Sequence, residues 1–173
     1  MIEVFDVLLT PDKSNAVFRL VMDSLYRIGW NDTNEPQYKG FPCLYSQYSF
    51  EDVTRLKILD PVLKKLKRKK ITIKNYSQCI VNLTKPMDVN FIHVHEDEIV
   101  ALYYCNLTWQ PEWGGETLFY KDDKKDILLS SPYVPNRLII FDGKIAHTIK
   151  AQNILGPSYR FTISLFFNKT PGK

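Results

Sequence analysis

From residue 71 onward the chain is a series of short β-branched and aromatic segments with no helical pattern between them. Clusters of Pro, Gly, Asn and Asp separate these segments, as is typical of turns. Parallel strands need long crossover connections, so strands joined this closely indicate an antiparallel sandwich or barrel. The expected strands span residues 71–83, 99–107, 116–120, 138–141 and 159–167.

The residues before this region predict a mostly helical N-terminal part. Pro11 follows Thr10, and this pair is a common helix start. Ser49 and Asp52 have the spacing of a capping box, and Pro61 is expected to break or kink the helix that follows them. The expected elements are a strand over residues 2–9, a helix over 12–29, a long loop over 30–48 and a helix over 50–68.

Length and composition favour one domain. The chain has 173 residues, of which 45% are hydrophobic, enough for a full core. We therefore expect a single domain over residues 1–173, with helical support over about 10–70 and a β-core over about 71–168. The N-terminus does not resemble a signal peptide, and the apolar runs are shorter than a membrane span needs.

The cysteines bear on the redox environment of the protein, and the charge bears on whether it binds nucleic acid. Cys43, Cys79 and Cys105 are an odd number without a CxxC pair, so we expect reduced thiols in the cytoplasm. The net charge of +4 does not by itself argue for nucleic acid. The basic run at residues 64–70 is interpreted as a solvated helix end, and a phosphate contact of a nucleic-acid oxygenase is the alternative.

The chain contains only three histidines, and they suggest a metal site. In an extended segment, residues two apart point to the same side, so His95 and Asp97 can present an imidazole and a carboxylate together. His147, after a later strand, can complete the set. Two His and one carboxylate leave positions open and suit non-haem Fe(II). His93 is also two residues from His95, and a set of three His would instead suit zinc or a cupin-type metal.

Arg160 is the second unusual residue, because it lies in an otherwise apolar strand. A buried guanidinium needs an anion. One interpretation is a salt bridge to an acid at the edge of the core, such as Glu116. The other is a clamp on a ligand carboxylate, assisted by Ser164, which lies four residues on and on the same strand face.

Several motifs in order resemble the 2-oxoglutarate- and Fe(II)-dependent dioxygenases of the prolyl 4-hydroxylase type. The resemblance covers about residues 75–168. The pieces are His95-Glu96-Asp97, Tyr103-Tyr104-Cys105-Asn106-Leu107-Thr108-Trp109, Gly114-Gly115-Glu116-Thr117, Arg137-Leu138-Ile139-Ile140-Phe141-Asp142, His147 and the segment 159–164.

The resemblance implies a mainly β fold with N-terminal helices around a double-stranded β-helix, or jelly-roll, core. It implies that His95, Asp97 and His147 bind Fe(II) and are the catalytic residues. Arg160 and Ser164 would bind the distal carboxylate of 2-oxoglutarate, and the Tyr104 hydroxyl would reach the same carboxylate. A second, upstream tyrosine of some relatives has no clear counterpart, although Asn82 or Tyr76 could take its place.

The implied activity is hydroxylation of an unactivated C–H bond, with a peptidyl proline as the expected target. The expected partners are O2 and a peptide, protein or amino-acid substrate, and ascorbate is expected to support activity. Two alternatives stay open, because one fold hosts many functions: a hydroxylase of another residue or free amino acid, and an inactive metal-binding β-barrel module.

Overall fold

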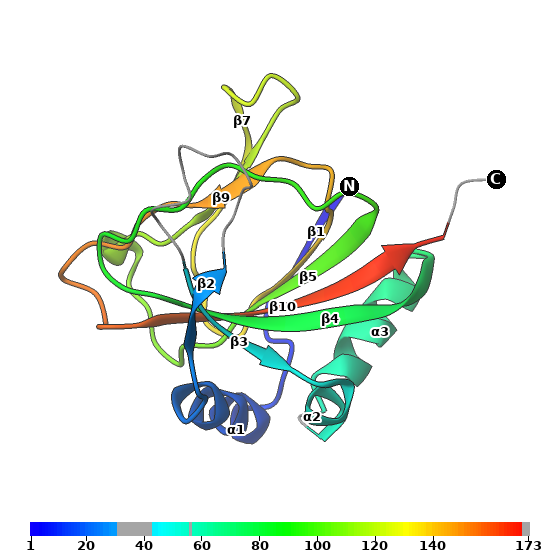
Figure 1. Ribbon diagram of the computed structural model, residues 1–173, viewed down its shortest axis with the longest axis horizontal. Coiled ribbons are helices and arrows are strands. Elements are labelled where there is room, and N and C mark those ends of the chain that lie inside the picture. Colours follow the sequence, from blue (N-terminus) through cyan, green and yellow to red (C-terminus); the bar gives the residue numbers. More distant parts are fainter. Residues whose placement is uncertain (31–42, 56, 171–173) are drawn as a thin grey trace.

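The computed structural model describes residues 1–30, 43–55 and 57–170. Most of the regular structure is antiparallel strand, as expected (Figure 1). The helices are α1 (Pro11–Met22), α2 (Phe50–Arg55) and α3 (Leu59–Arg68), with a short 3-10 turn at Pro111–Trp113. The strands are β1 (Ile2–Phe5), β2 (Arg27–Trp30), β3 (Cys43–Tyr48), β4 (Ile73–Thr84), β5 (Glu98–Tyr104), β6 (Thr117–Tyr120), β7 (Ile127–Ser131), β8 (Leu138–Asp142), β9 (His147–Ile149) and β10 (Arg160–Lys169).

The strands form two sheets, hereafter the major and the minor sheet. The major sheet has seven strands in the order β1-β8-β5-β10-β4-β3-β2, and the minor sheet has three in the order β7-β6-β9. Every strand pair in both sheets is antiparallel. The predicted fold class is confirmed: this is a mainly β jelly-roll core with N-terminal helices.

The central strands of the major sheet are buried on both faces. In β10, Phe161, Ile163 and Leu165 join the core on one face. That core includes residues from α1 and α3, and Figure 1 shows these helices along the same side of the sheet. The alternate residue Phe166 joins a second core, which also contains Phe119 from the minor sheet. The period of two along β10 therefore directs one set of side chains to the helices and the other to the space between the sheets.

Several N-terminal elements differ from expectation. The first strand ends at Phe5 rather than at Leu9. Helix α1 ends at Met22 rather than near Gly29, because the chain turns and forms β2. The second helix is divided before Leu59, and Pro61 lies in the first turn of α3 rather than at the break. Proline is tolerated there, since first-turn N–H groups have no partner within the helix.

The region 30–48, expected as a loop, contains β3, which pairs with β4. The rest of that expected loop, residues 31–42, lies outside the described residues. The capping box at Ser49 and Asp52 is confirmed, because each backbone N–H donates to the other residue's side-chain oxygen at 3.1 Å. In the part of the chain that the structure describes, no helix is long and apolar enough to cross a membrane.

Candidate metal centre and anion site

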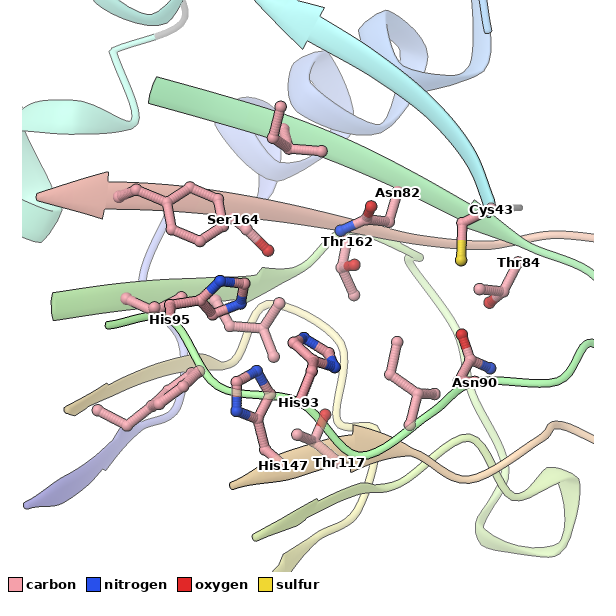
Figure 2. A pocket seen from close by; sticks show the side chains of 16 residues that line it. Cys43, Asn82, Thr84, Asn90, His93, His95, Thr117, His147, Thr162 and Ser164 are labelled. Atoms are coloured by element: carbon pink, nitrogen blue, oxygen red, sulfur yellow. The ribbon is translucent and has the colours of Figure 1, made fainter. Parts of the chain in front are cut away.

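The three histidines meet on the side of the major sheet that faces the minor sheet. One ring nitrogen from each of His93, His95 and His147 lies within 4.8 Å of the others. Their ring centroids are 4.4 to 5.2 Å apart. Figure 2 shows the imidazoles together at one end of a cavity of about 50 Å³, with Cys43, Thr84 and Asn90 toward the other end.

Main-chain hydrogen bonds place these histidines. His93 and His147 form an isolated antiparallel bridge, in which each N–H donates to the other's carbonyl at 3.0 Å. The N–H of His95 donates to the carbonyl of Gly143 at 2.8 Å. A side chain at Gly143 would overlap the His95 carbonyl, so this turn needs a glycine for close approach.

The imidazoles are set up as neutral ligands. Burial lowers the pKa of His95 to about 3, and the nearby His93 adds to the effect. Burial likewise lowers the pKa of His147 well below its ordinary value, with further lowering by the other two rings. Nδ1 of His93 lies 2.9 Å from the Phe91 carbonyl, and Nδ1 of His147 lies 2.9 Å from the Ile145 carbonyl. A carbonyl only accepts, so both Nδ1 atoms carry the proton and both Nε2 atoms are free to bind a metal.

Asp97 is placed differently from the three histidines. Its side chain is exposed, and it does not belong to the group of close ligand atoms. His93 forms an antiparallel bridge, and the rings of His93 and His95 lie with centroids 5.0 Å apart, but the chain turns at Glu96 and Asp97, where Asp97 has a left-handed φ of 57°. The same-side rule for residues two apart therefore applies to His93 and His95 and not to His95 and Asp97.

Arg160 is completely buried on β10, on the face that points between the sheets. Its Nε donates to the Gly115 carbonyl at 3.1 Å, whereas Nη1 and Nη2 have no hydrogen-bond partner among the residues that the structure describes. Its guanidinium carbon lies 4.7 Å from the ring centre of Tyr133 and 5.4 Å from that of Tyr104. Burial lowers the pKa of Arg160, but a guanidinium stays charged in proteins.

The salt bridge from Arg160 to Glu116 is absent, because among the described residues no carboxylate lies within 4.0 Å of the guanidinium. Glu116 Oε1 instead lies 3.9 Å from Lys150 Nζ, and its buried Oε2 has no hydrogen-bond partner in the described part of the chain. A buried cation with two unused donors is costly by itself and suits a ligand carboxylate.

The other residues of the predicted anion site are close to the cavity. Ser164 lines it (Figure 2). Tyr104 and Arg160 are not among the lining residues, but the Tyr104 hydroxyl donates to Thr117, which is one of them, at 2.7 Å. Glycine at position 115 lets Arg160 pack closely, since a Cβ there would lie 3.3 Å from its Cδ and Nε.

Sequence reasoning did not single out some of the cavity residues. Thr162 lines the cavity and lies between Arg160 and Ser164 along one face of β10, and within residues 1–30, 43–55 and 57–170 its buried hydroxyl has no hydrogen-bond partner. The alternation along that strand could have identified it. Of the two candidates for the upstream tyrosine position, Asn82 lines the cavity, whereas Tyr76 packs against Phe50 and Phe167.

No protein-family model matches the chain, and no curated protein matches its sequence. Solved structures do match its fold. A prolyl hydroxylase from Trichoplax adhaerens, in complex with a hypoxia inducible factor peptide fragment, is 16% identical, with 97% of this chain and 83% of that chain covered and a TM-score of 0.64.

Two further structures resemble the chain to the same degree. A Pseudomonas putida prolyl-4-hydroxylase is 14% identical, with 98% of this chain and 92% of that chain covered and a TM-score of 0.66. HygX from Streptomyces hygroscopicus, with nickel and 2-oxoglutarate bound, is 9% identical, with 98% and 83% covered and a TM-score of 0.69. The chain therefore has the fold of these enzymes, and the resemblance noted in its motifs is confirmed at the level of architecture.

Proposed function

We propose that the protein is an Fe(II)- and 2-oxoglutarate-dependent dioxygenase. One observation carries the proposal: a cluster of three imidazoles lines a cavity, and the strand that passes this cavity also carries a buried guanidinium with two nitrogens that have no partner among the described residues. Along β10 the residues on that face are, in order, Arg160, Thr162, Ser164 and Phe166. The Phe166 ring packs against His95 with centroids 4.9 Å apart, so one strand connects the cationic end of the site to the imidazole end.

The donor set fits the proposed groups. Imidazole nitrogens bind iron, and three protein ligands leave positions for a co-substrate and O2. The guanidinium, which packs on the Tyr104 ring, suits the far carboxylate of 2-oxoglutarate, and the Ser164 hydroxyl lies farther along the same face of β10. Bound Fe(II) supplies the oxidising chemistry: 2-oxoglutarate, O2 and a substrate C–H give succinate, CO2 and a hydroxylated product.

The protein's own residues position the reactants. Arg160 and the Ser164 hydroxyl hold the co-substrate in one orientation, and orientation decides which C–H bond is attacked. The apolar side chains of the cavity, among them Leu102, Phe141 and Phe166, limit the access of water.

A succinate assay tests the activity. Purified protein with Fe(II), ascorbate, 2-oxoglutarate and O2 is expected to form succinate, and His147→Ala is expected to lose that turnover. Lys144→Ala, an exposed change in the turn before His147, serves as the matched control. A wild-type protein that is loaded with Fe(II) and neither binds 2-oxoglutarate nor forms succinate would overturn the proposal in favour of an inactive metal-binding module.

For the substrate we propose a peptidyl proline. Two of the structures with this fold are prolyl hydroxylases, and one of them holds a peptide. The alternative is a different amino acid or small molecule, and HygX, which has also been solved with hygromycin B, supports it. Mass spectrometry of a panel of proline peptides, other peptides and free amino acids separates the two. Gain of one oxygen on proline supports the proposal, and gain only on another target refutes it.

A further inference from the structure

We infer that this protein binds its metal with three imidazoles, those of His93, His95 and His147, and with no carboxylate. The inference rests on the proposed function and concerns the ligands of that same site. It departs from the HxD pattern of the resembling dioxygenases, in which a carboxylate follows the first histidine by two residues. This chain contains both a His93-His95 pair and a His95-Asp97 pair at this spacing, and it is His93 and His95 whose ligand atoms lie close to those of His147.

The backbone is the first reason. His93 lies in an antiparallel bridge, and the rings of His93 and His95 have centroids 5.0 Å apart, so both side chains point to the same side. His93 is fixed opposite His147 by two main-chain hydrogen bonds, and the N–H of His95 is held by the Gly143 carbonyl. The positions of all three rings therefore follow from backbone pairing, without any contribution from Asp97.

The position of Asp97 is the second reason. The chain leaves the extended conformation at this residue, and its carbonyl accepts a hydrogen bond from the N–H of Lys169 at 2.9 Å. That bond ties Asp97 to the end of β10, on the major sheet. The side chain is exposed, so it has no desolvation cost that a metal would need to offset.

The ring tautomers are the third reason. His93 and His147 each donate Nδ1–H to the carbonyl two residues earlier, and the same arrangement on two residues leaves Nε2 of each as a metal ligand. A solvated His93 would have no need of this bond. His93 is therefore prepared as a ligand to the same degree as His147.

The charge of the site changes as a result. A divalent metal with three neutral imidazole ligands would form a centre with a net charge of +2. Replacing one imidazole with a carboxylate would reduce the net charge to +1. A doubly charged centre binds a dianion such as 2-oxoglutarate as a neutral complex. We therefore expect tighter retention of the co-substrate than in a variant, His95→Asp, that restores a carboxylate at the second position of the pair.

Co(II) titration followed by visible absorption tests the ligand set in the full chain without relying on turnover. His93→Ala is expected to weaken Co(II) binding by about 100-fold or more. Removing a residue that only hydrogen-bonds to a metal ligand already costs about 10- to 100-fold in affinity, and removing a ligand should cost more. Asp97→Asn is expected to bind Co(II) within about twofold of the wild type, as is Glu96→Gln, the matched control in the same exposed turn. The reverse pattern, with Asp97→Asn impaired and His93→Ala unaffected, would overturn the inference.

A second measurement avoids the risk that His93→Ala misfolds. Pulsed EPR of the wild-type protein loaded with Cu(II) counts coordinated imidazoles, and three are expected where the alternative set gives two. The inference and the proposed function can fail separately. A count of two with normal succinate formation refutes the three-imidazole set alone, whereas a count of three without any 2-oxoglutarate binding refutes the dioxygenase alone.

Discussion

His93 and His147 lie directly opposite each other and exchange two main-chain hydrogen bonds of 3.0 Å. They come from segments more than fifty residues apart, yet their relative position depends on the backbone and not on the side chains. A metal site built in this way is organised before the metal arrives, which reduces the cost of ordering the ligands on binding.

The metal-free protein is expected to lose stability in mild acid. The pKa values of His95 and His147 in the folded protein lie below the ordinary 6.5. As the pH falls below about 6.5, these two histidines become protonated in the unfolded chain but stay neutral in the folded chain. The free energy of unfolding therefore decreases. The decrease is at most about 1.4 kcal/mol per pH unit for each ring. Urea unfolding in the presence of a chelator, at pH 7.5 and 5.5, measures it.

A variant tests whether His147 contributes to this dependence of the unfolding free energy on pH. In His147→Asn the free energy of unfolding is expected to decrease less between the two pH values, because the variant lacks one of the two histidines whose pKa is lowered by folding. Lys144→Ala should keep the wild-type slope. Equal slopes for the wild type and His147→Asn would contradict the assignment.

Gly143→Ala is expected to damage both stability and metal binding. The added methyl group would overlap the His95 carbonyl and lie 2.9 Å from that of Glu98. Overpacking of this kind costs about 1–3 kcal/mol. The shift would also displace His95, so Co(II) affinity is expected to fall, while Lys144→Ala, one residue away, should leave it unchanged. A Gly143→Ala protein with wild-type affinity would show that the His95 backbone is not held by this turn.

Arg160→Lys is expected to weaken co-substrate binding without loss of metal. Lysine keeps the charge but cannot make the two parallel hydrogen bonds of a guanidinium. The KM for 2-oxoglutarate should rise by about tenfold or more, equivalent to about 1.4 kcal/mol. Co(II) affinity serves as the internal control. An unchanged KM would remove Arg160 from the proposed carboxylate site.

Tyr133→Phe separates the framework from the site. The Tyr133 hydroxyl accepts a hydrogen bond from the N–H of Asn106 at 3.0 Å and lies 2.7 Å from the Phe161 carbonyl. Its loss leaves the buried N–H unpaired, at a cost of about 1–3 kcal/mol measured by urea unfolding. The ring that Arg160 packs on is kept, so the KM for 2-oxoglutarate should not change. Tyr159→Phe, on a half-exposed ring, should cost much less.

Sequence reasoning succeeded where local pattern decides structure. Strands β4, β5, β6, β8 and β10 were predicted from their apolar and aromatic runs, because central strands of a buried sheet need such residues on both faces. Strands β2, β7 and β9 were not predicted, and neither was β3. Its segment, Cys43–Tyr48, contains polar residues and is only partly buried, and it becomes a strand through pairing with β4, a long-range interaction that no local pattern reports.

In the candidate site, too, the residues predicted from local pattern differ in outcome from the one whose position depends on a turn. His95, His147, Arg160 and Ser164 were predicted from residue type, order and strand alternation, and the structure places all four beside or along one cavity wall. The prediction for Asp97 assumed that the chain stays extended past His95. The chain instead turns at Glu96 and Asp97, where Asp97 has a left-handed φ. The spacing of the residues in the sequence does not reveal such a turn.

The three histidines also belong to different parts of the fold. His147 begins β9 of the minor sheet, whereas His95 precedes β5 of the major sheet by a two-residue turn. A bound metal would therefore act as a covalent-like cross-link between the two sheets. Metal loading should raise the force and the time needed to separate them, and slow amide hydrogen exchange in β6 and β9 would be its signature. A metal at the proposed catalytic centre would therefore also stabilise the contact between the two sheets.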